Sequence, residues 1–365
     1  TMNKQELNQS LKALCPVNER SQSPMVKVNR LAYMRYGRKD INQAIEFFED
    51  FGLTLDVKQD NKAYLRSIEN ASHAVILEES HQEYSIIGFT VSNYLKLEKL
   101  AQKTQLPIHT RQDPLGGFYV SLLDPDNNII EVNCDLRVLS KAAHYQPAVQ
   151  ANTPTQKPRL NNIVRPNLAP PPIARLGHTV MGVSKIQKSI HWYQDTLGFI
   201  VSDFQMLEGH ALPTVAFLRC DKGLTPSDHH TLAIGSAVAI GHEHTAFEVT
   251  DIDLIAMGQK WLKSKNYHHS WGIGRHILGS QIFDYWRDPW GFQFEHYCDG
   301  DVFDHQVATE YCHFDGDSLS QWGPKVTKDM LGIIPSFSLV IGVIKHLFSN
   351  TDLNFKRLIS LIKAT

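Results

Sequence analysis

The segment DPWGFQFE, residues 288–295, has a counterpart earlier in the chain, DPDNNIIE, residues 124–131, and the two align without a gap. Three more pairs of segments match in the same order: RLAY from Arg30 with RLGH from Arg175, INQAIEFFEDFG from Ile41 with IQKSIHWYQDTLG from Ile186, and IIGFTV from Ile86 with HTAFEV from His244. Four matched segments in one order are hard to obtain by chance. The chain therefore contains two copies of one structural unit.

Each copy combines helices and strands in a pattern typical of an α+β domain. A short strand and a helix come first, and β-rich runs follow between turn residues: AYLRSI and HAVILEE in the first copy, TVAFLRC and TLAIG in the second. A second helix, YLKLEKLAQKT or DLIAMGQKWLKSK, precedes the last two strands. We expect two domains of paired βαβββ modules, each forming a curled, mostly antiparallel sheet around a cavity.

The length of the chain also favours two domains, because 365 residues are more than one hydrophobic core usually serves. Residues 141–172 are rich in proline and poor in apolar residues, as linkers often are. We expect five segments: an N-terminal arm over 1–25, a first domain over 26–140, this linker, a second domain over 173–325 and a helical tail over 326–365.

The tail contains two apolar segments. IIPSFSLVIGVIKHLF, from Ile333 to Phe348, is short for a membrane span and includes Lys345 and His346, so we expect a helix that packs on the protein or on a second subunit. TDLNFKRLISLIKA follows, with apolar residues at helical spacing and N-cap candidates at Thr351 and Asp352. It predicts a closing amphipathic helix.

The charge balance and the cysteines argue against several classes of protein. Lys and Arg number 36 against 38 Asp and Glu, which gives no electrostatic reason to bind nucleic acid or an anionic membrane. The five cysteines are widely spaced without a CxxC pair, which favours free thiols in a reducing compartment. The N-terminal residues are polar and mixed in charge, unlike a secretory signal. We expect a cytoplasmic protein.

Three polar residues of the second copy are of the types that form a non-haem iron site. His178 follows Gly177 at the end of a predicted strand, His244 replaces the apolar Ile86 of the first copy, and Glu295 lies in the apolar run FQFEHY. A carboxylate there is costly to bury unless it is paired or binds a cation. Two imidazoles and one carboxylate on separate strands bind Fe(II) and leave positions open. The alternatives are ordinary core or edge histidines and a structural role for the carboxylate.

Other histidines lie close to these candidates in the sequence. His242 would point to the same face of a regular strand as His244, but the repeat selects His244. His296 is expected on the opposite face from Glu295, at the surface. The remaining histidines, expected to be structural or to lie in loops or at the surface, include His191, His268, His269, His305 and His313.

The first copy has lost the histidines of this site. Aligning the copies pairs Tyr33 with His178, Ile86 with His244, Gln112 with His276, Ser121 with Tyr285 and Glu131 with Glu295. A three-ligand site that lacks both imidazoles should not hold a metal ion at useful affinity. We therefore expect a structural role for the first copy and chemistry in the second.

Three further residues are candidates for the chemistry itself. His230, in DHHTLAIG, could take a proton from a bound phenol and return it later, and its neighbour His229 would face away on an extended strand. His276 and Tyr285 are spaced to lie on adjacent hairpin strands, where both could reach one edge of a substrate. The alternatives are a loop histidine and a core tyrosine with a satisfied hydroxyl.

The second copy resembles the type I extradiol catechol dioxygenases of the vicinal oxygen chelate superfamily. The resemblance rests on a histidine, a tyrosine and the D-P-x-G-x-x-x-E signature, which stand here as His276, Tyr285 and residues 288–295. It extends from about Val26 to Pro324, and the metal-free first copy resembles the two-domain members of the family. The residues it implies as Fe(II) ligands are His178, His244 and Glu295, and those it implies as catalytic are His230, His276 and Tyr285.

The resemblance also implies an activity. It is the insertion of both atoms of O₂ into a small catechol-type aromatic diol at Fe(II), or at Mn(II) in its place, by an enzyme of the EC 1.13.11 type. We further expect a homo-oligomer. Three features depart from the family: Asp284 precedes the tyrosine where an apolar residue is usual, the Pro-rich linker is long, and the tail after Pro324 has no counterpart.

Three other functions stay open at this stage. Two are metal enzymes on the same scaffold, an isomerase of the glyoxalase type and a keto-acid-dependent dioxygenase. Neither needs the set of His230, His276 and Tyr285 around a diol. The third is a non-catalytic protein that binds an aromatic ligand, which an absence of bound metal would favour.

Overall fold

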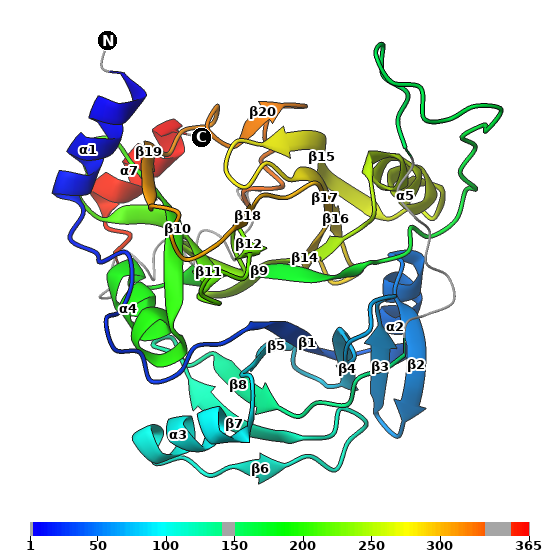
Figure 1. Cartoon of the computed structure of the whole chain (residues 1–365), viewed down its shortest axis with the longest axis horizontal. Helices are drawn as coiled ribbons and strands as arrows, with labels where there is room; N and C mark the ends of the chain where they lie inside the picture. Colours follow the sequence, from blue (N-terminus) through cyan, green and yellow to red (C-terminus); the bar gives the residue numbers. More distant parts are fainter. Residues whose placement is uncertain (1–2, 141–149, 333–351, 365) are drawn as a thin grey trace.

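A computed structural model describes residues 3–140, 150–332 and 352–364 of the chain. It contains two large sheets, one from each copy of the repeat, and β1 of the first sheet lies against β9 of the second. In Figure 1 the first copy, blue to cyan, lies below the second, green to orange. The expected α+β fold is confirmed, and each large sheet contains two βαβββ modules.

The first sheet has eight strands in the order β2-β3-β4-β1-β5-β8-β7-β6. Its strands are β1 (Arg30–Arg38), β2 (Thr54–Gln59), β3 (Lys62–Arg66), β4 (Val75–Glu79), β5 (Tyr84–Thr90), β6 (His109–Thr110), β7 (Phe118–Leu123) and β8 (Ile129–Cys134). The two modules meet where β1 pairs antiparallel with β5. Within each module, the first and last strands pair in parallel and the other pairs are antiparallel.

The second sheet repeats this order and adds a strand at each edge: β19-β10-β11-β13-β9-β14-β17-β16-β15-β20. Its strands are β9 (Arg175–Val183), β10 (Phe199–Met206), β11 (Pro213–Cys220), β13 (Leu232–Ser236), β14 (Gly241–Glu248), β15 (His268–His276), β16 (Ile282–Arg287), β17 (Gln293–Cys298), β19 (Glu310–His313) and β20 (Ser320–Trp322). Strands β12 (Ser227–Asp228) and β18 (Val302–Phe303) form a separate ribbon.

Six helices lie among the described residues: α1 (Lys4–Leu14), α2 (Ile41–Asp50), α3 (Tyr94–Thr104), α4 (Ile186–Leu197), α5 (Ile252–Ser264) and α7 (Phe355–Ala364). The Asp40 carboxylate accepts hydrogen bonds from the first turn of α2. The corresponding residue before α4, Lys185, cannot cap its helix, and Asp352 from the tail instead accepts a hydrogen bond from Ile186 N at 2.7 Å. The tail therefore supplies the N-terminal cap of α4.

The closing helix predicted in the tail is present, but its start differs from the expectation. Helix α7 begins at Phe355, and its first turn is capped by Asn354, whose side chain accepts a hydrogen bond from Arg357 N at 3.0 Å. Thr351 and the apolar run Ile333–Phe348 lie outside the described residues. Helix α1 in the N-terminal arm was not predicted.

The repeated Asp-Pro turn has the same hydrogen bonds in both copies. The Asp124 carboxylate accepts from the backbone of Asp126 and Asn128, and the Asp288 carboxylate accepts in the same way from Trp290 and Phe292. Each aspartate also reaches across to the other copy: Asp288 binds the buried guanidinium of Arg38 at 3.1 Å, and Asp124 accepts from the hydroxyl of Tyr193 at 3.0 Å. The motif that reveals the repeat thus also joins the copies.

Aromatic packing completes the interface between the copies. Phe47 and Phe48 of α2, and Phe51 directly after it, pack against Phe294 of β17, with ring centroids 5.0–6.2 Å apart. All four side chains are fully buried and belong to one hydrophobic core that spans both copies. The face of β17 opposite Glu295 is therefore held in place by a helix of the first copy.

Among the described residues, no helix combines the length and the apolar character that crossing a membrane requires. All five cysteines are free, as the spacing predicted. The described part of the linker, residues 150–172, contains no helix or strand. The domain boundaries given above stay a prediction.

Candidate metal centre

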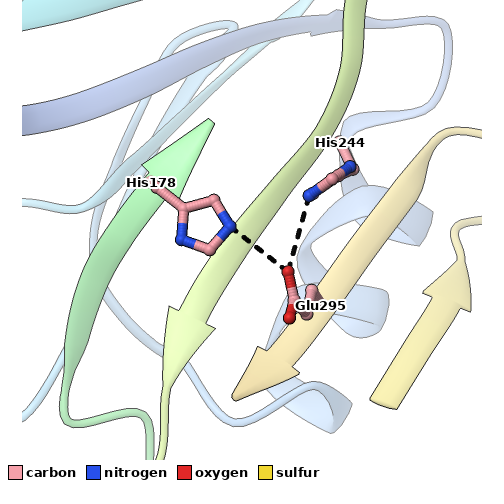
Figure 2. A group of neighbouring side chains, drawn as sticks. All are labelled: His178, His244 and Glu295. Atoms are coloured by element: carbon pink, nitrogen blue, oxygen red, sulfur yellow. Dashed lines mark ion pairs between the residues drawn. The ribbon is translucent and has the colours of Figure 1, made fainter. Parts of the chain in front are cut away.

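His178, His244 and Glu295 come from three neighbouring strands of the second sheet. In the register of the sheet, His178 on β9 lies opposite Ala246 on β14, which in turn lies beside Glu295 on β17. His244 precedes Ala246 by two residues and shares its face of the strand. Pairing between strands thus brings two imidazoles and a carboxylate to one side of the sheet (Figure 2).

The distances within this group match a common metal ligand set. The Nε2 atoms of His178 and His244 lie 3.3 and 3.4 Å from the same carboxylate oxygen of Glu295. One ligand atom from each residue lies within 4.8 Å of the other two, and all three side chains are buried. This is the spacing expected when three side chains share one ion.

The charges at this site also fit a cation. Burial alone would raise the pKa of Glu295, but His178 and His244 outweigh it and hold that pKa well below its usual range, so the carboxylate is ionised. Burial lowers the pKa of His178, which keeps its imidazole neutral and able to coordinate. Glu295 is completely buried, and neither of its oxygens accepts a hydrogen bond. A divalent ion would compensate this charge.

His276 and Tyr285 lie together beside this group, as their spacing predicted. The Nδ1–H of His276 donates to the carbonyl of Leu319 at 2.8 Å, so its Nε2 accepts from the hydroxyl of Tyr285 at 2.9 Å. His276 Nε2 is also 3.8 Å from the second oxygen of Glu295. Burial raises the pKa of Tyr285 well above its ordinary value, so the phenol keeps its proton. The Leu319 carbonyl had no signal in the sequence.

His230 lies against the same group, with its ring centroid 4.1 Å from that of His178. Burial, followed by the neighbouring histidines, lowers its pKa well below the ordinary value. The expectation that His229 faces away is wrong, because the chain bends here instead of running as a strand. Both rings are buried, and their Nδ1 atoms are 2.9 Å apart. On its other side, His229 contacts the carboxylate of Asp203.

The expectation for His242 is also wrong. A β-bulge in β14 between His242 and His244 adds one residue, so the two side chains point to opposite faces. His242 Nε2 is 2.8 Å from the hydroxyl of Thr245, on the face that meets Tyr36 of the first copy. It therefore belongs to the interface between the copies and not to the candidate metal centre.

His296 does point away from Glu295, but it is not at the surface. It is completely buried, stacks on Phe51 with ring centroids 3.8 Å apart, and bonds the Phe51 carbonyl through Nε2 at 2.7 Å. Burial lowers its pKa to about 4. Helix α2 of the first copy covers the face of β17 that would otherwise meet solvent.

Asp284, the unusual acidic residue before Tyr285, is buried on the far face of β16. Its carboxylate accepts from Gln259 at 3.0 Å and from the indole N–H of Trp286 at 2.7 Å, and it contacts His269 Nε2 at 2.7 Å. His269 is therefore part of strand β15 and partly buried, not a surface or loop residue as expected. This network supports the strand that carries Tyr285.

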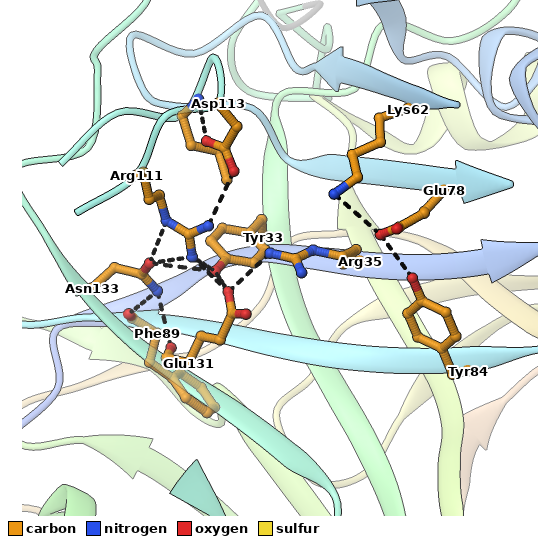
Figure 3. Close-up of polar contacts among 11 residues, drawn as sticks. Tyr33, Arg35, Lys62, Glu78, Tyr84, Phe89, Arg111, Asp113, Glu131 and Asn133 are labelled. Atoms are coloured by element: carbon orange, nitrogen blue, oxygen red, sulfur yellow. Dashed lines mark hydrogen bonds and ion pairs between the residues drawn. The ribbon is translucent and has the colours of Figure 1, made fainter. Parts of the chain in front are cut away.

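The matching position in the first copy contains a network of charged side chains instead of histidines (Figure 3). Glu131 is bound by the guanidinium of Arg111 at 2.5 Å and by that of Arg35 at 3.1 Å, and the hydroxyl of Tyr33 donates to it. Asn133 accepts from Arg111 at 2.8 Å. Arginine here supplies the positive charge that a metal ion would supply in the second copy.

The sheet registers confirm the repeat alignment of the copies except at one position. Arg111, and not Gln112, is the counterpart of His276. Arg111 N donates to the carbonyl of Gly117 and His276 N donates to that of Gln281, at the same place in the two hairpins. The short strand β6 gave no sequence signal strong enough to fix the alignment to one residue.

The two copies share a further pair of matching residues that was not predicted. The pairing of β4 with β1 and of β13 with β9 sets His73 of the first copy at the position of His230. His73 is buried and its Nε2 contacts the carboxylate of Asp56 at 2.8 Å. Aligning HAVIL with HTLAI would have shown this pair. No motif pointed to Asp203.

Comparison with known proteins gives relatives for most of the chain. The model of the Glyoxalase/Bleomycin resistance protein/Dioxygenase superfamily matches residues 175–296. Metapyrocatechase 2 of Cupriavidus necator is 26% identical over 318 residues, covering 85% of this chain and 94% of that protein. An iron-dependent extradiol dioxygenase of Rhodococcus jostii (strain RHA1) is 23% identical over 314 residues, covering 82% and 97%.

Solved structures share the fold over a similar extent. An extradiol ring-cleaving dioxygenase from B. fuscum has a TM-score of 0.70 at 18% identity and covers 86% of this chain and 84% of its own. A Mn(II)-bound glyoxalase from Novosphingobium aromaticivorans has a TM-score of 0.69 at 22% identity and covers 85% and 95%. Two different activities therefore occur on this fold, and the side chains of the site must distinguish them.

Proposed function

We propose that the chain, whose residues 175–296 match the model of the glyoxalase/bleomycin resistance protein/dioxygenase superfamily, is an extradiol (meta) ring-cleaving dioxygenase of the EC 1.13.11 type. It inserts both atoms of O₂ into a catechol-type aromatic diol at a non-haem Fe(II) site. The observation that carries this proposal is the convergence of two buried imidazoles and one buried carboxylate, with His230, His276 and Tyr285 around them.

In this proposal His178, His244 and Glu295 hold the ion from one side and leave its other positions open. Fe(II), or Mn(II) in its place, supplies the redox chemistry that couples a bound catecholate to O₂. Burial keeps His178 neutral, which a coordinating imidazole requires. The full burial of Glu295 removes competing water from the carboxylate.

The residues around this group would bind and deprotonate the diol. His230 is neutral and lies against His178, so it can accept a proton from a diol hydroxyl and donate it back later in the reaction. Tyr285 keeps its hydroxyl proton, which it donates to His276 here, and can donate it to a substrate oxygen instead once the diol is bound. The Leu319 carbonyl orients His276 so that its Nε2 faces Tyr285.

The three other functions on this scaffold are weaker. An isomerase or a keto-acid-dependent dioxygenase would use the metal group but has no need of an acid–base histidine and a tyrosine–histidine pair at a diol. A non-catalytic aromatic-binding protein has no need of a buried, uncompensated Glu295. We also propose that the protein works in a reducing cytoplasm, for which the five free thiols are the support. The homo-oligomer stays a prediction.

The experiment is reconstitution with Fe(II) under anaerobic conditions, addition of a panel of substituted catechols, and then admission of air. We expect O₂ consumption equal to the catechol consumed and a product that absorbs visible light. A metal-loaded protein that turns over no catechol but isomerises a hemithioacetal would contradict the proposal and support the isomerase.

A further inference from the structure

Three buried side chains in contact with one another lead from the candidate metal centre to β10 of the second copy. His230 faces the metal ligands, and its Nδ1 is 2.9 Å from Nδ1 of His229. The Nε2 atom of His229 contacts Asp203 on β10. All three residues are at least nine-tenths buried, with exposures of 4% for His230, 1% for His229 and 5% for Asp203. The sequence suggested none of these contacts.

The chemistry of the three groups determines the direction of the hydrogen bonds. The carboxylate oxygen of Asp203 accepts, so His229 donates its Nε2–H to Asp203. With this proton on Nε2, His229 has a lone pair on Nδ1, which accepts from the Nδ1–H of His230. His230 is therefore left with its lone pair on Nε2. That is the atom free to accept a proton from outside these three side chains.

The surrounding structure fixes the middle ring in place. The backbone N–H of His229 donates to the Asp301 carbonyl at 2.9 Å, and its carbonyl accepts from the hydroxyl of Ser202 at 2.6 Å. The ring lies between Phe217 and Phe303, with centroids 5.6 and 5.3 Å away. A methyl group added at Gly279 would come within 3.0 Å of its Nδ1. The ring has little freedom to rotate away from His230.

We propose that Asp203 and His229 are positioning residues of the reaction, which hold His230 in the tautomer that presents an unprotonated Nε2 to the diol. The inference rests on the proposed function. When His230 accepts the diol proton at Nε2, its Nδ1–H bond to His229 stabilises the resulting imidazolium, and the Asp203 carboxylate supplies the balancing charge at the far end. The proton leaves again from Nε2, so the three side chains hold the same number of protons before and after the reaction.

The first copy provides a comparison for this arrangement. His73, the counterpart of His230, binds Asp56 directly at 2.8 Å with no second imidazole between them. The copy that lacks the metal ligands thus has the simpler pair. The interposed His229 occurs only in the copy where the histidine lies against the candidate metal ligands.

The kinetic test uses Asp203→Asn, His229→Phe and His229→Gln in the full-length, iron-loaded protein. The asparagine amide can donate to His229 and so reverse the tautomers of His229 and His230. Phenylalanine at position 229 cannot hydrogen-bond to either His230 or Asp203. Asp203→Asn and His229→Phe should each lower kcat about 10- to 100-fold with KM little changed. Glutamine can accept from His230 and donate to Asp203, so it should restore most of the activity. Asp56→Asn, the matched change in the first copy, should leave kcat unaltered.

A double-substitution cycle separates positioning from general support of the fold. Adding Asp203→Asn to His230→Ala should lower kcat no further, because Asp203 acts only through His230. Additive losses would overturn the proposal and give Asp203 a structural role. Normal turnover by Asp203→Asn would overturn it as well. If the unsubstituted protein turned over no catechol, the proposed function would fail first.

Nitrogen-15 NMR of the metal-free protein tests the hydrogen bonds without reference to activity. We expect His230 to be protonated at Nδ1 and unprotonated at Nε2, and the tautomer to invert in Asp203→Asn. A His230 protonated at Nε2 in the unsubstituted protein would overturn the proposal even if catechol cleavage is observed. His229→Gln, the mildest change, serves as the folded variant if Asp203→Asn proves unstable.

Discussion

The two copies of the repeat each bury a glutamate at the same point of their own sheet and surround it with different side chains. In the first copy, Arg111 and Arg35 bind Glu131 directly. In the second, Glu295 lies beside the imidazoles of His178 and His244 and accepts no hydrogen bond. The first arrangement is complete as it stands, whereas the second has a negative charge that a metal ion would compensate.

The difference shows how one fold can bury the glutamate either with arginines or with a candidate metal ligand set. A buried carboxylate without a partner destabilises a protein by several kcal/mol, so losing the ion requires another positive charge. Arg111 occupies the position of His276 and provides that charge. Tyr33, in place of His178, donates to the same carboxylate. The substitutions in the first copy are therefore mutually dependent.

The largest effect is expected from removing a ligand in the second copy only. His178→Ala or His244→Ala should reduce bound metal from about one ion per chain to near zero and lower catechol cleavage by more than about 10³-fold, since two remaining ligands hold the ion poorly. Metal analysis after desalting, together with O₂ uptake, measures both.

Tyr33→Phe is the matched control in the first copy and should leave the metal content unchanged. If Tyr33→Phe released the ion while His178→Ala retained it, the roles of the copies would be reversed. If neither change altered the metal content, the ion would bind elsewhere.

A smaller effect is expected at the position that pairs with the glutamate across the hairpin. Tyr285→Phe removes the hydroxyl that contacts His276 and should lower kcat about 10- to 100-fold at unchanged metal content. Ser121→Ala changes the equivalent residue of the first copy and should have no effect on kcat. Equal losses in the two variants would show that this position acts through stability alone.

A change in the first copy should instead lower the stability of the protein. Arg111→Met leaves Glu131 with Arg35 as its remaining cation, and we expect the free energy of unfolding in urea to fall by about 3 kcal/mol. Lys62→Met breaks a more exposed pair with Glu78 in the same sheet and should cost at most about 1 kcal/mol. Equal losses would mean that Arg111 does not compensate a buried charge.

The repeat made most of the site predictable from the sequence. Comparing the copies picked out His178 and His244, because the other copy has an aromatic or aliphatic residue at each position, and Glu295 was picked out by its place in an apolar strand. This comparison depends on strand alternation, which holds along regular strands. It failed at His242, where a β-bulge adds a residue, and at Gln112, where the strand is too short to fix the alignment.

Contacts between distant segments could not be read from the sequence. His296 was assigned to the surface because strand periodicity gives the face of a residue but not what covers that face, here Phe51 of the other copy. The contact of Asp203 with His229 likewise joins β10 to a bend far along the chain. Periodicity along one strand does not carry such information.

The smallest expected effect is the pH dependence of stability that comes from Glu131 of the first copy. Burial would raise the pKa of Glu131, but Arg35 and Arg111 outweigh it and lower that pKa below its ordinary value of 4.5. The unfolded chain therefore binds a proton at a higher pH than the folded protein does. The stability from this group is complete above pH 4.5 and is lost as the pH falls through the folded pKa.

Glu131→Gln should consequently weaken the protein at neutral pH and flatten the fall in stability below pH 4.5. Urea unfolding between neutral and acidic pH measures both changes. Parallel curves for the variant and the unsubstituted protein would mean that Glu131 is not held ionised by its arginines. The first copy would then bury its glutamate uncharged, and arginine could not be the substitute for the ion.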